Sequence, residues 1–100
     1  MLTNKMPPIH PGEILADELE ALSLSANKFA NALHVPPNRI SEILRGRRGL
    51  TADTALRFSR FFGTTAQFWM NLQVAYDLRS TEIDHGSQIE AEIEQVAHCA

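Results

Sequence analysis

Seven polar residues in one short segment have side chains suited to reading and holding double-stranded DNA. They are Asn38, Arg39, Ser41, Glu42, Arg45, Arg47 and Arg48. Asn can pair with adenine and Arg with guanine through two hydrogen bonds, and Glu can accept one from cytosine. Each good bidentate pair gives roughly 1–3 kcal/mol of discrimination. Arg47 and Arg48 follow Gly46, where guanidinium groups could contact phosphates on either side of the groove.

Two short helices are expected to position these side chains. Their apolar stripes are Phe29, Ala30 and Leu33, then Ile40, Ile43 and Leu44. Helical spacing within each stripe predicts that each helix buries one face. Ser25 suits the cap of the first helix and Pro37 the first turn of the second. The break at 34–37 is too short for an antiparallel hairpin, so the sequence predicts a helix-turn-helix over 25–48, with His34 where a glycine is usual.

The charge distribution separates this segment from the rest of the chain. The net charge of the whole chain is −3, but residues 36–60 carry six arginines against two carboxylates. Residues 1–35 and 61–100 are both net acidic. A local positive field attracts phosphates, and binding should weaken steeply as salt rises. The alternative, a merely polar helix face on a small all-α domain, would not require this clustering of arginines.

The remaining chain predicts a single small all-α domain of five helices. One hundred residues can bury one modest core. We expect a flexible segment at 1–9 and a DNA-binding domain at 10–79. Its first helix begins near His10, its fourth is capped by Thr51 and stopped by Gly63, and its fifth spans 66–78. His10 is expected to be a cap or a solvated residue rather than a metal ligand.

The fifth predicted helix has more apolar surface than one face can use. We select Phe68, Trp69, Leu72 and Tyr76 as candidates for a homodimer interface. The alternative is that Trp69 and Tyr76 complete the core of one chain. Dimerisation has an independent argument, because a two-fold dimer can read two half-sites about one turn of DNA apart.

Residues 80–100 predict an acidic tail or a short C-terminal helix. Ser87 and Glu90 fit a capping box, and Ile89, Ile93 and Val96 follow at helical spacing. An isolated helix shorter than about 12–15 residues is marginal in water, which favours a fraying tail unless a partner covers the apolar stripe.

Composition and motifs argue against catalysis, cofactors and membranes. The chain has four scattered histidines, no phosphate-binding glycine loop and no pair of carboxylates in an apolar setting, so we expect no catalytic residues, no metal and no cofactor. The single cysteine, Cys99, fits a reducing cytosol. No apolar run approaches the roughly 18 residues of a membrane span. We expect a cytoplasmic protein; a protein-binding adaptor that has lost DNA binding is a further alternative.

Three stretches together resemble the HigA/VapI-type antitoxins, a branch of the phage-repressor-like (Xre) helix-turn-helix proteins. They are HPGEIL at 10–15, RISEILRGRRGLTADTALRFSRFFGT at 39–64 and QFWMNLQVAYDLR at 67–79. The resemblance covers roughly residues 8–80 and implies a compact phage-repressor-like fold. It places the recognition residues at Asn38, Arg39, Ser41 and Glu42, followed by the basic Arg45, Arg47 and Arg48.

The same resemblance implies a homodimeric repressor that binds a palindromic operator in its own promoter. It also implies a protein partner, a HigB-type toxin that is an mRNA-cleaving ribonuclease of the RelE class. The acidic flanks suit a basic ribonuclease. An orphan Xre-family regulator without a toxin partner would have the same sequence features.

Overall fold

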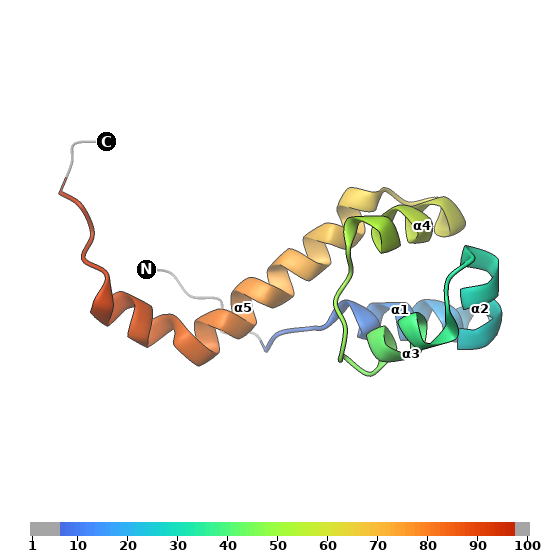
Figure 1. Ribbon diagram of the computed structural model, residues 1–100, viewed down its shortest axis with the longest axis horizontal. Coiled ribbons are helices and arrows are strands. Elements are labelled where there is room, and N and C mark those ends of the chain that lie inside the picture. The colour runs from blue at the N-terminus through green and yellow to red at the C-terminus, as the bar shows by residue number, and fades with distance from the viewer. Residues whose placement is uncertain (1–6, 98–100) are drawn as a thin grey trace.

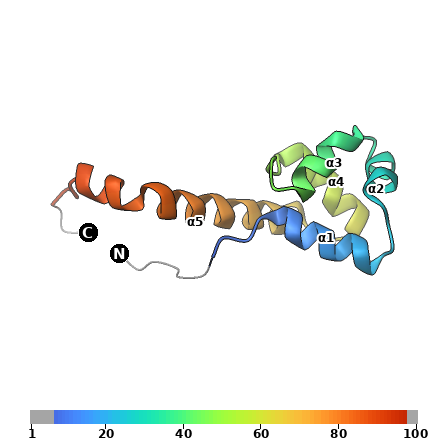
Figure 2. The same ribbon diagram turned by 90° about the horizontal axis from the view of Figure 1, so that it is seen from below.

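The computed structural model describes residues 7–97, and these residues form five helices and no strand. The helices are α1 (Pro11–Ala21), α2 (Ala26–Leu33), α3 (Pro37–Leu44), α4 (Ala52–Phe62) and α5 (Ala66–Glu92). The predicted all-α class with five helices is therefore confirmed. The helices α1 to α4 and the first half of α5 pack into one body, and the second half of α5 projects from it (Figure 1 and Figure 2).

Side-chain caps mark the starts of four of the five helices, while α3 begins at Pro36–Pro37 without one. Ser25 accepts the backbone N–H of Lys28 at the start of α2. Thr51 and Thr65 cap α4 and α5 in the same way. Such caps satisfy N–H groups that have no intrahelical partner. The element boundaries therefore follow from local chemistry.

His10 is a cap, as expected. Its Nδ1 accepts the Gly12 backbone N–H at 2.9 Å, while the backbone N–H of His10 donates to the Glu13 carboxylate at 3.0 Å. The residue is 7% exposed, and its ring lies edge-on to Tyr76 of α5, with 4.8 Å between ring centroids. The capping box fixes the start of α1, and the ring contact packs it against α5.

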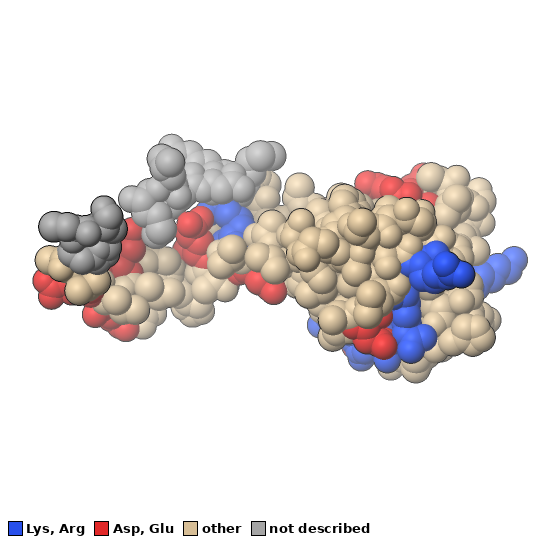
Figure 3. Space-filling model, turned by 90° about the horizontal axis from the view of Figure 1, so that it is seen from above, with Lys and Arg blue, Asp and Glu red and all other residues tan. Residues whose placement is uncertain are grey.

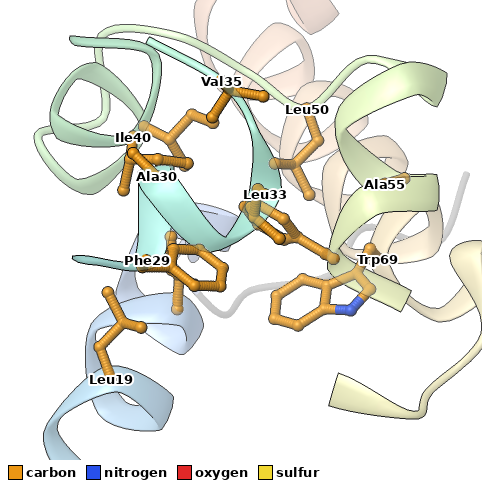
Figure 4. Close-up of a cluster of buried hydrophobic side chains, with 12 residues drawn as sticks. Leu19, Phe29, Ala30, Leu33, Val35, Ile40, Leu50, Ala55 and Trp69 are labelled. Carbon is orange, nitrogen blue, oxygen red and sulfur yellow. The ribbon is translucent and has the colours of Figure 1, made fainter. Parts of the chain in front are cut away.

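The core lies between the predicted stripes of α2 and α3 and the inner face of α4 (Figure 4). Phe29 packs against Phe58, and Phe58 packs edge-on to Trp69, with 5.0 Å between the last two ring centroids. Edge-to-face aromatic pairs of this kind add to the free energy gained from burial. α4 and α5 are therefore joined to the helix-turn-helix through aromatic rings.

Trp69 is a core residue, so its assignment to a dimer interface is wrong. Its side chain is 1% exposed and its Nε1–H donates to the Thr64 hydroxyl at 2.9 Å. The alternative interpretation, in which it completes the core, is confirmed for this residue. Phe68 is exposed, while Leu72 and Tyr76 are partly buried. These three stay candidates for the interface.

α5 continues to Glu92, so the prediction of a fifth helix ending near residue 78 and a separate element at 80–100 is wrong as far as Glu92. Ser87 lies inside the helix and caps nothing. No proline interrupts residues 79–92, and one partly exposed helical glycine, Gly86, costs only about 1 kcal/mol. The Arg79–Glu82 ion pair, at 2.9 Å, bridges the predicted break. Residues 93–97 then leave the helix.

No helix within residues 7–97 has the length and apolar character that crossing a membrane would require.

Candidate nucleic-acid interface

The turn between α2 and α3 has the geometry that a helix-turn-helix requires. His34 is left-handed, with φ 60° and ψ 45°, and is the C-cap of α2. The Val35 N–H donates to the Ala30 carbonyl at 3.1 Å, which closes the turn. His is among the non-glycine residues that tolerate positive φ, so its predicted place in the turn is confirmed.

α1 packs against the buried side of α3. The side chains of Ile40 and Ile43 are fully buried. Gly12 of α1 lies so close to the Ile43 carbonyl that a Cβ added there would overlap the oxygen. The backbones of the two helices therefore touch, and this contact fixes α3 with its polar face outward.

Four of the predicted DNA-binding residues are open to solvent. Asn38, Arg45, Arg47 and Arg48 are exposed on α3 and in the loop that follows it. Figure 3 shows Lys and Arg side chains gathered on the body and mostly acidic side chains along the projecting part of α5. The basic end of the molecule thus coincides with the helix-turn-helix, as the charge count predicts.

Several of the predicted residues already have partners. Arg48 pairs with Glu42, with 3.2 Å between Nη2 and Oε2, and Ser41 donates to the Asn38 carbonyl. Arg39 pairs with Asp53 of α4, with 3.0 Å between Nη1 and Oδ2. The structure therefore does not leave Arg39 and Glu42 free to meet base edges until these ion pairs open.

Asp53 and Arg57 are residues of the site that the sequence analysis did not select. Asp53 accepts from Arg39 and from the Nε of Arg57, and Arg57 also donates to the Leu33 carbonyl at 2.8 Å. The network joins the start of α3 to α4 and to the end of α2. Its one sequence signal is the i,i+4 spacing of Asp53 and Arg57 on the predicted fourth helix.

A cleft of about 280 Å³ lies between α3, the following loop and the start of α4. Arg39, Arg48 and Arg57 line it, together with Asp53 and the capping Thr51. Guanidinium groups and the positive end of a helix dipole favour anionic groups. The cleft therefore extends the basic surface of α3 onto α4.

The ion pairs around Asp53 predict a pH dependence of stability. Hydrogen bonding by Arg57 is the main cause that holds the pKa of Asp53 below its ordinary value of 3.8. Its contribution is thus present above pH 3.8 and is lost as pH falls through the lowered pKa of the folded state. We expect Asp53→Asn to lose less stability than the wild type as pH falls below 3.8, measured as the midpoint of thermal unfolding followed by circular dichroism. The same loss of stability in both proteins would contradict the assignment.

Within residues 7–97, no three His, Cys, Asp or Glu side chains gather closely enough to hold a metal ion. The surface around α3 instead offers amide, carboxylate and guanidinium groups, which is the chemistry of base edges and phosphates.

The comparisons with known proteins agree with this geometry. The family model described as helix-turn-helix matches residues 15–69. Virulence-associated protein I of Dichelobacter nodosus is 59% identical over 85 residues, which are 84% of this chain and 79% of that protein. A HigA-family addiction module antidote protein from Coxiella burnetii superimposes with a TM-score of 0.89 at 53% identity, covering 91% of this chain and 100% of the other. The chain belongs to the HigA/VapI-type branch of the helix-turn-helix family.

A further HigA/VapI-type structure was solved with nucleic acid. It is the Pseudomonas aeruginosa antitoxin HigA with the higBA promoter, which has a TM-score of 0.88 and 48% identity and covers 90% of this chain and 99% of that one. The resemblance seen in the sequence is thereby confirmed, as is the expectation that the chain is not an enzyme, because the relatives are named as transcriptional regulators and antitoxins.

Proposed function

We propose that this HigA/VapI-type protein is a cytoplasmic transcriptional repressor that binds a palindromic operator in its own promoter as a homodimer. The observation that carries the proposal is the exposed polar face of α3, held rigidly by α1 and flanked by arginines. The P. aeruginosa HigA structure with promoter DNA supports it, because that chain has the same fold over nearly its full length.

The side chains of α3 divide into readers and anchors in this proposal. Asn38 and Ser41 face base edges in the major groove, and Arg39 and Glu42 join them when their ion pairs with Asp53 and Arg48 open. Arg45, Arg47 and Arg48 lie beside the groove and contact the phosphates that flank it. Breaking the Arg39–Asp53 pair costs little, because both side chains are partly exposed at 29% and 57%.

The dimer forms through α5 in this proposal. Leu78 is 68% exposed and Ile89 is 45% exposed, on one side of a helix that projects from the body (Figure 2). Val74, half-exposed, lies one turn before Leu78 on the same side. Exposed apolar side chains along one helix face mark an interaction surface. Phe68, exposed on the adjacent side of α5, widens the same surface. Leu72 and Tyr76 lie further round the helix toward the body, where Tyr76 contacts His10, so they could border this surface only at its edge.

We further propose that the protein neutralises a HigB-type toxin, an mRNA-cleaving ribonuclease. Asp17, Glu18 and Glu20 are exposed on α1, and Glu90 and Glu92 are exposed near the end of α5. Acidic surfaces complement the basic surface that an RNA-gripping enzyme needs. The antitoxin names of the relatives support this role. An orphan regulator of the same family, with no toxin partner, is the second candidate.

The deciding experiment is a titration of the purified protein against its own upstream promoter DNA and a scrambled duplex at two salt concentrations. A preference for the promoter that falls with salt supports the repressor. Equal, feeble binding to both duplexes would contradict it. Co-expression with the product of an adjacent small gene, followed by co-purification and a growth assay, then separates the antitoxin from the orphan regulator.

Two substitutions test the division into readers and anchors. Arg39→Ala should relax base preference at one position in each half-site, because it removes a base contact. Arg47→Ala should weaken binding to all duplexes alike and flatten the salt slope by about one unit, because it removes one phosphate contact. The measurement is a titration against single-base operator variants over a salt series. Identical behaviour of the two variants would refute the division.

A further inference from the structure

Gln73 links α5 to the loop that carries the anchoring arginines. The residue is 8% exposed, although its side chain is polar. Its Oε1 accepts the backbone N–H of Leu50 at 2.7 Å, and its Nε2–H donates to Asp77 Oδ1 at 2.9 Å, one turn further along α5. Both ends of the amide are therefore engaged, so the orientation of the side chain is fixed.

The loop at 45–51 fits closely around this amide. A Cβ added at Gly49 would lie 2.8–3.0 Å from the three terminal atoms of Gln73, so the backbone rests directly on the side chain. At its other end, the loop is fastened to α3, because the Arg47 N–H donates to the Glu42 carbonyl at 2.8 Å. Hydrogen bonds thus join the loop to the end of α3 and to the first half of α5.

We propose that Gln73 is a positioning residue that sets which half-site spacing the dimer accepts. This inference rests on the proposed function, in which α5 joins the two protomers and the loop at 45–51 holds phosphates. α5 then works as a strut, with the partner on one side and the loop on the other. Because the Gln73 amide fixes the loop to the strut, it fixes the distance between the anchoring arginines of the two protomers.

Spacing is the property that such a strut controls. One inserted base pair moves a half-site by about 3.4 Å along the DNA and turns it by about 35° about the axis. A rigid dimer cannot follow both changes, whereas a loop that shifts on α5 can follow part of them. A purely structural role for Gln73 would change stability and would leave spacing discrimination intact.

The chain offers a chemical swap that isolates this contact. Gln73→Met keeps the volume but leaves the buried Leu50 N–H without an acceptor, which is costly. Gln73→Glu keeps the acceptor but sets a second carboxylate against Asp77. In Q73E/D77N, the new carboxylate at position 73 still accepts from Leu50, and the new amide at position 77 donates to that carboxylate. Both hydrogen bonds are then restored with the donor exchanged. Asp77→Asn alone keeps the Gln73 donor paired and is the matched control.

The experiment measures the affinity of each full-length variant for three duplexes, namely a single half-site, the natural operator and an operator with one base pair inserted at its centre. We expect the wild type and Asp77→Asn to bind the inserted operator at least about 10-fold more weakly than the natural operator. For Gln73→Met and Gln73→Glu this difference should be less than about 3-fold, and their affinity for the half-site should stay within about 2-fold of the wild type. Q73E/D77N should recover the wild-type discrimination.

Two results would overturn the inference. One is that Gln73→Met or Gln73→Glu discriminates between the natural and inserted operators as strongly as the wild type does. The other is that these variants lose as much affinity for the half-site as for the natural operator, which would mark Gln73 as structural. If Gln73→Met does not fold, the pair Q73E and Q73E/D77N decides by the same criteria. A wild type with no preference for the operator over scrambled DNA would instead refute the proposed function, and this inference with it.

Discussion

Trp69→Ala is expected to lower the free energy of unfolding by about 3–5 kcal/mol, which is a large part of the stability of a domain this small. The indole is 1% exposed and packs edge-on to Phe58, while its N–H is satisfied by the Thr64 hydroxyl. Truncation removes the ring that joins α4 to α5 and leaves a cavity between them. Urea unfolding followed by circular dichroism measures the change.

Phe68→Ala is the matched control for this prediction. Phe68 neighbours Trp69 on α5 and is 44% exposed, and it contacts the indole edge-on with 5.3 Å between centroids. We expect it to cost no more than about 1.5 kcal/mol, because one partly exposed aromatic pair contributes about that much. Equal losses of unfolding free energy in the two variants would contradict the structure, in which Trp69 is buried and Phe68 is exposed.

The double variant Leu78→Asp/Ile89→Asp is expected to lose at least about 100-fold in affinity for a two-half-site operator, because the second half-site would no longer bind as part of the same molecule. Both side chains are exposed on the same face of α5. Two carboxylates placed in a self-complementary apolar interface would be buried without partners. Analytical ultracentrifugation measures the fraction of monomer, and titration against half-site and full operators measures the affinity for each.

The control carries the same charges on the opposite face of the helix. Ser87→Asp/Ala91→Asp adds two carboxylates at exposed positions of α5, away from Leu78 and Ile89. We expect it to stay dimeric and to bind the operator within about 3-fold of the wild type, since surface substitutions rarely change more. A dimer that survives Leu78→Asp/Ile89→Asp would place the interface elsewhere.

The candidate site shows where sequence reasoning stops. Which residues of α3 face outward follows from their spacing, and the left-handed His34 follows from backbone preferences, so both can be predicted from the sequence. The pairing of Arg39 with Asp53 is not, because fourteen residues separate the two along the chain and only the packing of α4 beside α3 brings them together. For this reason the sequence predicts Arg39 only as a base reader and not as the partner of Asp53.

The sequence by itself determined the caps, the two apolar stripes, the turn and the clustering of basic charge, because each depends on neighbours within one or two helical turns. Only the tertiary structure decided that Trp69 is in the core and that Gln73 reaches Leu50, 23 residues away. It also showed α5 running unbroken to Glu92, where a local capping signal at Ser87 had favoured a new start. Local signals fix where a helix can begin, whereas burial and long-range pairing depend on which surfaces the folded chain brings together.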